Sequence, residues 1–188
     1  MSLNKFNTTI ASWLKWIAIY LLIGGIVGTA TAFFLQTLDD VTLFREKHIW
    51  VVYFLPIAGL VIGLVYYYYG ESANKGNNLI IETHHSLENG ETPKPIPFKM
   101  APMVYLSTLL THIVGGSAGR EGTAVQMGGA IADQFTGLFK LNTADRKTIL
   151  IIGISSGFAA VFGTPLAGAF FAIEILSITN TKKNQLAA

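Results

Sequence analysis

Long runs without a charged residue alternate with short polar stretches along this chain. The uncharged runs cover residues 16–38, 49–70, 100–119 and 148–173. A helix of about 20 residues crosses the hydrocarbon core of a bilayer, so the first two runs are long enough for a full crossing. The pattern therefore predicts an all-α membrane protein.

The helical periodicity of the first run continues slightly beyond it, into the charged residues that follow. This continuation predicts a long, tilted helix. We expect residues 39–48, which are rich in charges, to form a polar loop after it. Small residues four apart, at Gly24 and Gly28 and again at Gly59 and Gly63, are typical of helices in close contact within membranes. These two pairs predict helix–helix contacts.

The last run is interrupted by Gly163, Thr164 and Pro165. A threonine followed by a proline is typical of a helix start, because threonine caps free N–H groups and proline fits the first turn. Two helices are therefore predicted in place of one. The segment 121–139 is short and contains Asp133, so we expect a helix that crosses the membrane only in part.

The polar stretch 70–100 predicts a short helix that starts near Asn77 with an asparagine as its cap. His84 and His85 are adjacent, which is a poor metal-ligand spacing, so a solvated loop pair is favoured and no metal site is expected. For His112, a hydrogen-bonded packing role is favoured over a proton relay.

Composition strengthens the membrane prediction. The 188 residues are 51% hydrophobic and only 13% charged, whereas about a quarter of the residues of a soluble domain are charged. A net charge of +2 does not favour a nucleic-acid partner, and the absence of cysteine excludes disulfides and thiolate metal sites. The lysine distribution favours a cytoplasmic N-terminus in a multi-pass plasma-membrane protein.

A glycine-rich stretch, residues 115–129, places Arg120 and Glu121 side by side directly after an uncharged run. Ionisable groups at membrane depth are costly and are usually functional. Glycines let the backbone approach a ligand, and the amides of a following helix start favour an anion. Neither a P-loop nor a dinucleotide motif fits here. The alternative is a glycine-rich turn whose ion pair reaches towards the membrane surface.

Broken, unequal helices with glycine-rich starts are typical of transporter and channel sites. An intramembrane enzyme is not favoured, because the apolar segments hold no Ser/His pair, zinc motif or paired carboxylates.

Two segments resemble motifs of one family. Gly119-Arg120-Glu121-Gly122 is similar to the G-[RK]-E-G-P motif of the CLC chloride channels and proton antiporters, and residues 162–174 resemble a later helix of that family. The resemblance implies a CLC-type transporter half with tilted and partly spanning broken helices.

Three departures from the chloride-transporting members resemble the fluoride/proton antiporter branch. Asn77 stands where those members have an anion-binding serine, and Thr123 stands where a proline is usual. Ile175 follows Glu174 where the chloride/proton antiporters have an internal proton glutamate.

The implied function is fluoride export in exchange for protons, with Glu121 as the gating and proton-carrying carboxylate and with no cofactor. The anion-binding residues that the resemblance implies are Asn77, Asn78, Gly119, Arg120, Gly122 and Thr123. The alternatives are a passive chloride or fluoride channel of the same fold, or a truncated membrane fragment that does not transport.

The family fold consists of two inverted halves, and this chain resembles the first half over residues 1–188. We therefore expect a fragment, or a half that needs the missing second half as a partner. The resemblance also implies a homodimer in the lipid bilayer, with fluoride or chloride and protons as its ligands.

Overall fold

A computed structural model describes residues 3–186 of the chain, and the side chains of residues 13–177. All regular structure in this range is helical, which confirms the all-α fold class. The elements in order are α1 (Leu3–Lys47), η1 (Ile49–Phe54), α2 (Leu55–Tyr69), η2 (Glu71–Lys75), α3 (Asn77–Glu88), α4 (Met100–Ile113), α5 (Arg120–Leu138), α6 (Thr143–Phe162) and α7 (Pro165–Leu186), where η marks a 3-10 helix.

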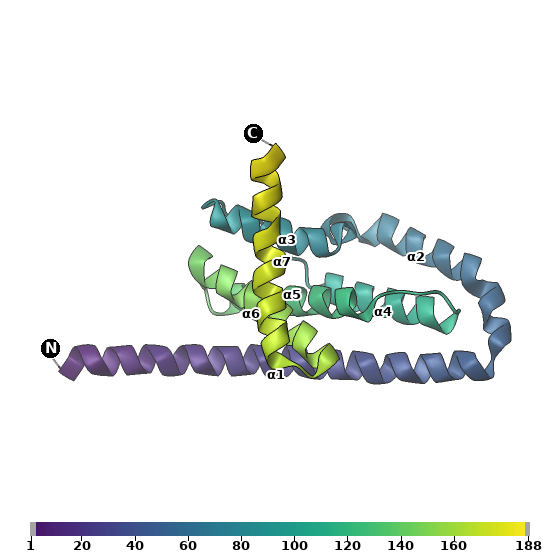
Figure 1. Cartoon of the computed structure of the whole chain (residues 1–188), viewed down its shortest axis with the longest axis horizontal. Helices are drawn as coiled ribbons and strands as arrows, with labels where there is room; N and C mark the ends of the chain where they lie inside the picture. The colour runs from purple at the N-terminus through teal and green to yellow at the C-terminus, as the bar shows by residue number, and fades with distance from the viewer. Residues whose placement is uncertain (1–2, 187–188) are drawn as a thin grey trace.

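Helix α1 is 45 residues long and runs along one side of the molecule (Figure 1). The prediction of a long helix is confirmed, but the prediction of a polar loop over residues 39–48 is wrong, because the helix continues to Lys47. No glycine or proline occurs between residues 29 and 55, so nothing in the backbone stops the helix there. Asp39, Asp40 and Glu46 are simply exposed on its surface.

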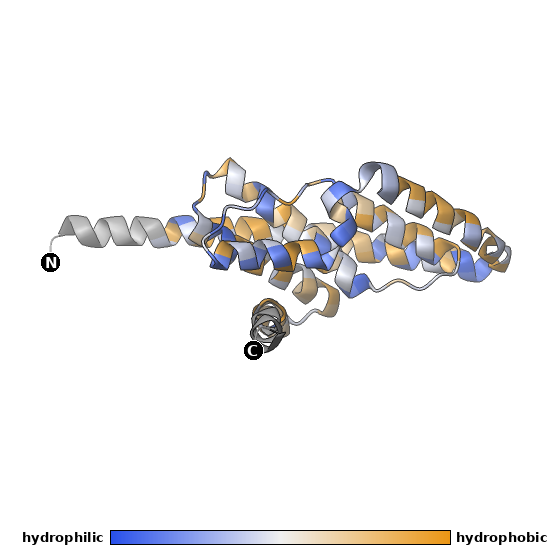
Figure 2. Ribbon diagram, turned by 90° about the horizontal axis from the view of Figure 1, so that it is seen from above, coloured by the Kyte–Doolittle hydropathy of each residue, from blue (hydrophilic) through white to orange (hydrophobic). Residues whose placement is uncertain are grey.

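Two helical segments, 13–47 and 49–69, are long and apolar enough to cross a membrane. They join at one end of the molecule, and α4 and α5 lie between α1 and the α2–α3 layer (Figure 1). Seen from above, apolar residues follow α2 along its length (Figure 2). Many of them are exposed, among them Ile57, Leu60 and Leu64, as expected for a surface that faces lipid or another protein segment.

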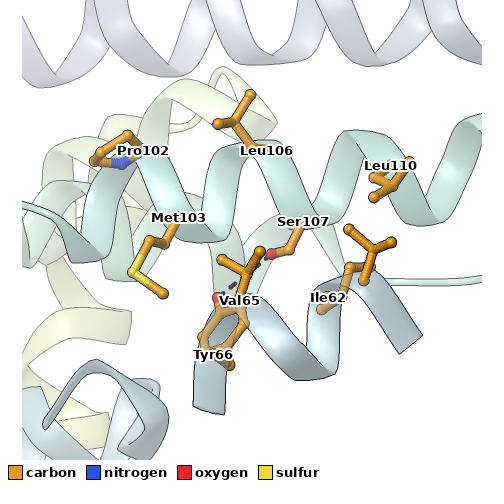
Figure 3. Close-up of a pocket in the computed structure, with 9 residues that line it drawn as sticks. Ile62, Val65, Tyr66, Pro102, Met103, Leu106, Ser107 and Leu110 are labelled. Atoms are coloured by element: carbon orange, nitrogen blue, oxygen red, sulfur yellow. Dashed lines mark hydrogen bonds between the residues drawn. The ribbon is translucent and has the colours of Figure 1, made fainter. Parts of the chain in front are cut away.

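A cavity of about 200 Å³ separates α2 from α4 (Figure 3). Apolar side chains such as Val65, Met103 and Leu106 line it, and the Tyr66 hydroxyl lies 3.3 Å from Ser107 Oγ on the opposite wall. This hydrogen bond joins α2 to α4 across the cavity.

The closest helix contact is between α5 and α6, where small residues meet. A methyl group added at Gly128 would clash with the carbonyl of Gly153, and one added at Gly157 would clash with the carbonyl of Ala124. Ala132 lies against Gly153 in the same way. Close approach through small residues is the usual basis of helix association in membranes, since it increases dispersion contacts between the backbones.

The small-residue pairs of α1 and α2, which were predicted to contact other helices, make few such contacts. Gly24 faces Ser156 on α6, with 3.6 Å between a Cβ placed at Gly24 and the Ser156 hydroxyl oxygen. Gly28, Gly59 and Gly63 have no neighbouring atom within 4 Å of such a Cβ, so the predicted contacts are wrong for these three positions within the described part of the chain.

The break at residues 163–165 is confirmed. Gly163 ends α6 in the left-handed conformation, with φ at 66°, and α7 begins at Pro165. The turn sends α7 across the other helices instead of alongside them (Figures 1 and 2). Helix α7 contacts α6 and α3, with the ring of Phe171 stacked on that of Phe158 at a centroid distance of 3.9 Å.

A buried ion pair connects α5, α6 and the segment before α4. Arg146 Nε donates to Asp133 Oδ1 at 2.7 Å, and Arg146 Nη2 donates to Asp133 Oδ2 at 2.8 Å. Asp133 lies on α5 and Arg146 on α6, and both side chains are buried. Two further N–H donors of its guanidinium bond the carbonyls of Pro93 and Lys94.

Candidate anion site

The start of α5 presents backbone N–H groups without a side-chain cap. Gly119 precedes the helix in an extended conformation, with φ at −73° and ψ at 125°, and no side chain bonds the amides of the first turn. The first N–H groups of an α-helix have no partner within the helix, and together with the aligned peptide dipoles they carry a partial positive charge. Arg120 and Glu121 are the first two residues of this helix.

The start of α3 is similar. The short helix is confirmed, but the expected asparagine cap is wrong: Gly76 occupies the cap position, with φ at 56°, and Asn77 is already helical. A positive φ is accessible to glycine at little cost, which explains why this residue precedes the helix. No side chain caps α3 either, so a second set of free N–H groups is available.

The two helix starts come together. A Cβ added at Gly122 would lie 3.4 Å from Asn77 Nδ2, and one added at Gly76 would lie 3.6 Å from Gln126 Nε2. Farther along, a Cβ at Gly129 would lie 2.6 Å from the Ile80 side chain. The glycines of α5 thus let α3 approach closely and place the Asn77 amide beside the first turn of α5.

The Asn77 side chain has an unsatisfied group. Its Oδ1 atom is buried and makes no hydrogen bond. The side-chain nitrogen of Asn77 carries two N–H donors. A half-turn about the last side-chain bond would therefore place these donors where the oxygen now lies. An unpaired buried polar atom is costly, and a water molecule or a bound ion is one way in which its bonding is completed.

Arg120 and Glu121 form a long ion pair, with 3.8 Å between Arg120 Nε and Glu121 Oε1. Both side chains are about half exposed, at 51% and 44%, so the pair contributes little to stability. The other carboxylate oxygen, Oε2, lies 3.3 Å from a Cβ placed at Gly119. The carboxylate of Glu121 is therefore positioned at the start of α5 and is not held in a buried pair.

The hydroxyl of Thr123 is bonded within the protein and is not positioned to donate to an anion. Its hydroxyl donates to the Gly119 carbonyl at 3.2 Å and bonds the Thr108 hydroxyl at 2.7 Å. This buried hydroxyl pair ties α4 to the first turn of α5. A contribution of Thr123 to anion binding would come from its backbone N–H.

The other candidate residues are spread more widely. Asn78 follows Asn77 on α3 and is exposed, and Glu174 is exposed on α7. His112 on α4 is partly buried, with Nδ1 at 2.9 Å from the Thr108 carbonyl, which confirms the hydrogen-bonded packing role. Gln126 lies beside Gly76 but was not among the predicted site residues. Its position four residues after Gly122, on the same face of the helix, could have indicated that it lies near the site.

Comparisons with known proteins identify the family of this chain. The family described as "Voltage gated chloride channel" matches residues 58–188. A protein of Pseudomonas syringae pv. tomato, described as "Chloride/fluoride channel protein", is 49% identical over 92% of this chain and 37% of its own length. A protein of Vibrio vulnificus, described as "H(+)/Cl(-) exchange transporter ClcA", is 30% identical over 92% of this chain and 39% of its own length.

A solved structure gives the same result for the fold. The crystal structure of a CLC-type fluoride/proton antiporter superposes with a TM-score of 0.78 and 38% sequence identity, over 85% of this chain and 39% of that chain. The present chain spans about two fifths of the length of these relatives. The family match covers well over half of the chain, and the helices superpose on a known CLC structure. The chain therefore belongs to the voltage gated chloride channel family and has the all-α membrane fold of CLC proteins.

Proposed function

We propose that this chain is the N-terminal, anion-handling half of a fluoride/proton antiporter. The observation that carries the proposal is the meeting of two uncapped helix starts, those of α3 and α5, around the Asn77 amide and Gly122. The resemblance of Asn77 and Thr123 to the fluoride branch supports the choice of ion, as does the solved fluoride/proton antiporter among the relatives.

Fluoride is small and strongly hydrated, so a binding site must replace its water with fixed donors. The backbone N–H groups of Arg120, Gly122 and Thr123, with the Asn77 amide turned to present N–H, would supply them. Gly119 allows the backbone to approach the ion, and Asn78 extends the donor set along α3. The positive ends of two helices lower the electrostatic cost of the anion.

Glu121 would couple the ion to the proton. When ionised, its carboxylate competes with the anion for the same N–H groups; when protonated, it leaves and admits fluoride. The free position of this side chain, close to Gly119 and outside any buried pair, supports such a movement. One carboxylate then both excludes the anion and carries the proton.

The full activity is proposed to need the further length of chain that the relatives have. We infer a multi-pass arrangement in the plasma membrane, assembled as a homodimer. The exposed apolar surface of α2 and α7, including Leu60, Phe170 and Ile173, supports contacts with lipid and with protein segments beyond the described residues.

The test is fluoride efflux from liposomes, followed with an ion-selective electrode, together with the proton uptake that accompanies it. The chain is reconstituted alone and with a co-expressed C-terminal half from a fluoride-transporting relative. We expect proton-coupled efflux in the complemented sample and its loss in Glu121→Gln. Glu174→Gln is the matched control, since it removes the same charge from α7. Coupling that survives Glu121→Gln, or is lost only in Glu174→Gln, would contradict the assignment.

A passive anion channel is the second candidate, because the P. syringae relative carries the printed description of a channel. The two functions differ in one measurement. An antiporter drives fluoride against its gradient when a proton gradient is imposed, whereas a channel only dissipates the fluoride gradient. Efflux without proton movement in the complemented sample would select the channel.

A further inference from the structure

Two adjacent histidines and a glutamate gather at the end of α3, away from the helix start. His84, His85 and Glu88 can each place one ligand atom within 4.8 Å of the ligand atoms of the other two. The sequence favoured a solvated loop pair for the histidines, and that interpretation is wrong. Both lie in a helix, and the His84 side chain is only 7% exposed.

The ring nitrogens of this cluster are incompletely bonded. His84 Nδ1 and His85 Nε2 are both buried and make no hydrogen bond. Buried polar atoms are nearly always paired, so the unbonded Nδ1 of His84, which lies 3.9 Å from Glu88 Oε2, indicates a missing ligand. The unbonded Nε2 of His85 is on the other side of its ring from Nδ1, the nitrogen beside Glu88. A neutral imidazole carries a lone pair on one ring nitrogen, which is the form that binds a metal ion.

The distances fit one metal ion. Glu88 Oε2 lies 3.1 Å from His85 Nδ1 and 3.9 Å from His84 Nδ1. Zinc–nitrogen and zinc–oxygen bonds of about 2.0–2.2 Å in a tetrahedron separate neighbouring ligand atoms by roughly 3.3–3.6 Å. Small side-chain rotations therefore bring these atoms to coordination distance.

From this geometry we propose that His84, His85 and Glu88 form a binding site for a divalent transition-metal ion of the zinc class. Two imidazoles and one carboxylate are a ligand set that zinc accepts, with the fourth position left for water. The site lies about 10 Å along α3 from Asn77, by helical rise, and is separate from the proposed anion site. A bound ion would replace the contact of Glu88 with the two rings and fix the end of α3.

Burial and the neighbouring charges affect the pKa of His84 and therefore the pH at which it can bind a metal ion. Burial lowers the pKa of His84 from its usual value; Glu88 acts in the opposite direction, and His85 and Lys147 act in the same direction as burial. Neutral His84 is therefore favoured at pH 7, as metal binding requires. The positive charge of Lys147 on α6 repels a cation, so it lowers the affinity for the metal ion without removing a ligand.

The experiment is a calorimetric titration of the purified, metal-free full chain in detergent with Zn²⁺, repeated with Co²⁺ followed by its visible absorption. We expect one ion per chain, and about a tenfold or larger loss of affinity in His85→Ala and in Glu88→Gln. His48→Ala removes a histidine that lies between α1 and η1 and is the matched control, with affinity expected within about twofold of the unchanged chain. Zinc should also raise the melting temperature of the unchanged chain but not of Glu88→Gln.

The proposal is overturned by the absence of saturable binding to the unchanged chain. It is equally overturned if His85→Ala and Glu88→Gln bind as tightly as the control, or if His48→Ala loses as much affinity as they do. Glu88→Gln preserves the shape of an exposed side chain, so it tests the site even where a change at the buried His84 unfolds the protein. Binding that strengthens as the pH falls below about 6.5 would also contradict imidazole ligation.

Discussion

Small residues four apart occur both in α2 and in α5–α6, but only the second set brings helices into close contact. In α5 and α6, Gly128 and Gly153 are in backbone contact. In α2, Gly59 and Gly63 have the same spacing and contact nothing within the described part of the chain. The spacing shows where a close contact is possible, whereas the position of the neighbouring helix decides whether it forms.

The difference has a physical basis. Helix α5 lies between α1, α4 and α6, so most of its residues before Gly137 are buried against other helices (Figure 1). Helix α2 meets α4 on one side only and leaves most of its surface uncovered. Inside a helix, a glycine is needed where two backbones approach; without such a neighbour it mainly adds freedom to the unfolded chain.

The largest expected effect is that of Gly128→Val. Its added atoms meet the Gly153 carbonyl, which cannot move without separating α5 from α6, so we expect the free energy of unfolding to fall by about 3 kcal/mol. Denaturant unfolding in detergent, followed by circular dichroism, measures the change. Gly137→Val on the same helix is the control, because Gly137 has open space around it. Equal losses in the two variants would remove the distinction between packed and open glycines.

Gly129→Ala should have an intermediate effect. The new methyl group meets the side chain of Ile80, which can rotate away, so we expect a loss of about 1–2 kcal/mol in the free energy of unfolding. Because Ile80 lies one turn after Asn77, the same change should also reduce fluoride movement in the complemented liposomes. Full transport with unchanged stability would show that the approach of α3 to α5 is looser than the structure indicates.

The smallest effect is expected for Gly59→Ala and Gly63→Ala. With no neighbour to displace, each change should raise the free energy of unfolding by about 0.5–1 kcal/mol through helix propensity. The same unfolding measurement on the chain alone checks this. A loss of stability here would mean that α2 is covered in solution, for example by a second copy of the chain.

The helix starts at Arg120 and Pro165 could be predicted because their signals are local. Glycines before Arg120 and the Thr164-Pro165 pair act on the backbone where they occur. The end of α1 could not be predicted from charge, because charged side chains on a helix surface remain hydrated and do not stop it. Only glycine, proline or a competing cap would have done so.

The residues of the candidate site were chosen from the resemblance, and no local sequence pattern predicts which of them meet. The neighbouring positions of Asn77 and Gly122, 45 residues apart in sequence, came from the resemblance and not from any local pattern. The ring nitrogens of His84 and His85 could not be recognised as buried, since burial depends on where α3 lies against the bundle. The pairing of Asp133 with Arg146 escaped prediction for the same reason.

The Asp133–Arg146 pair also has a consequence for hydrogen–deuterium exchange. Ile96 lies in an irregular segment, yet its amide donates to Asp133 Oδ2 at 2.7 Å and its carbonyl accepts from Gln134 Nε2 at 2.8 Å. Its amide proton should therefore exchange as slowly as those of the α5 interior, and only when the ion pair opens. This irregular segment and the buried charges then form a single unit that is protected or released together.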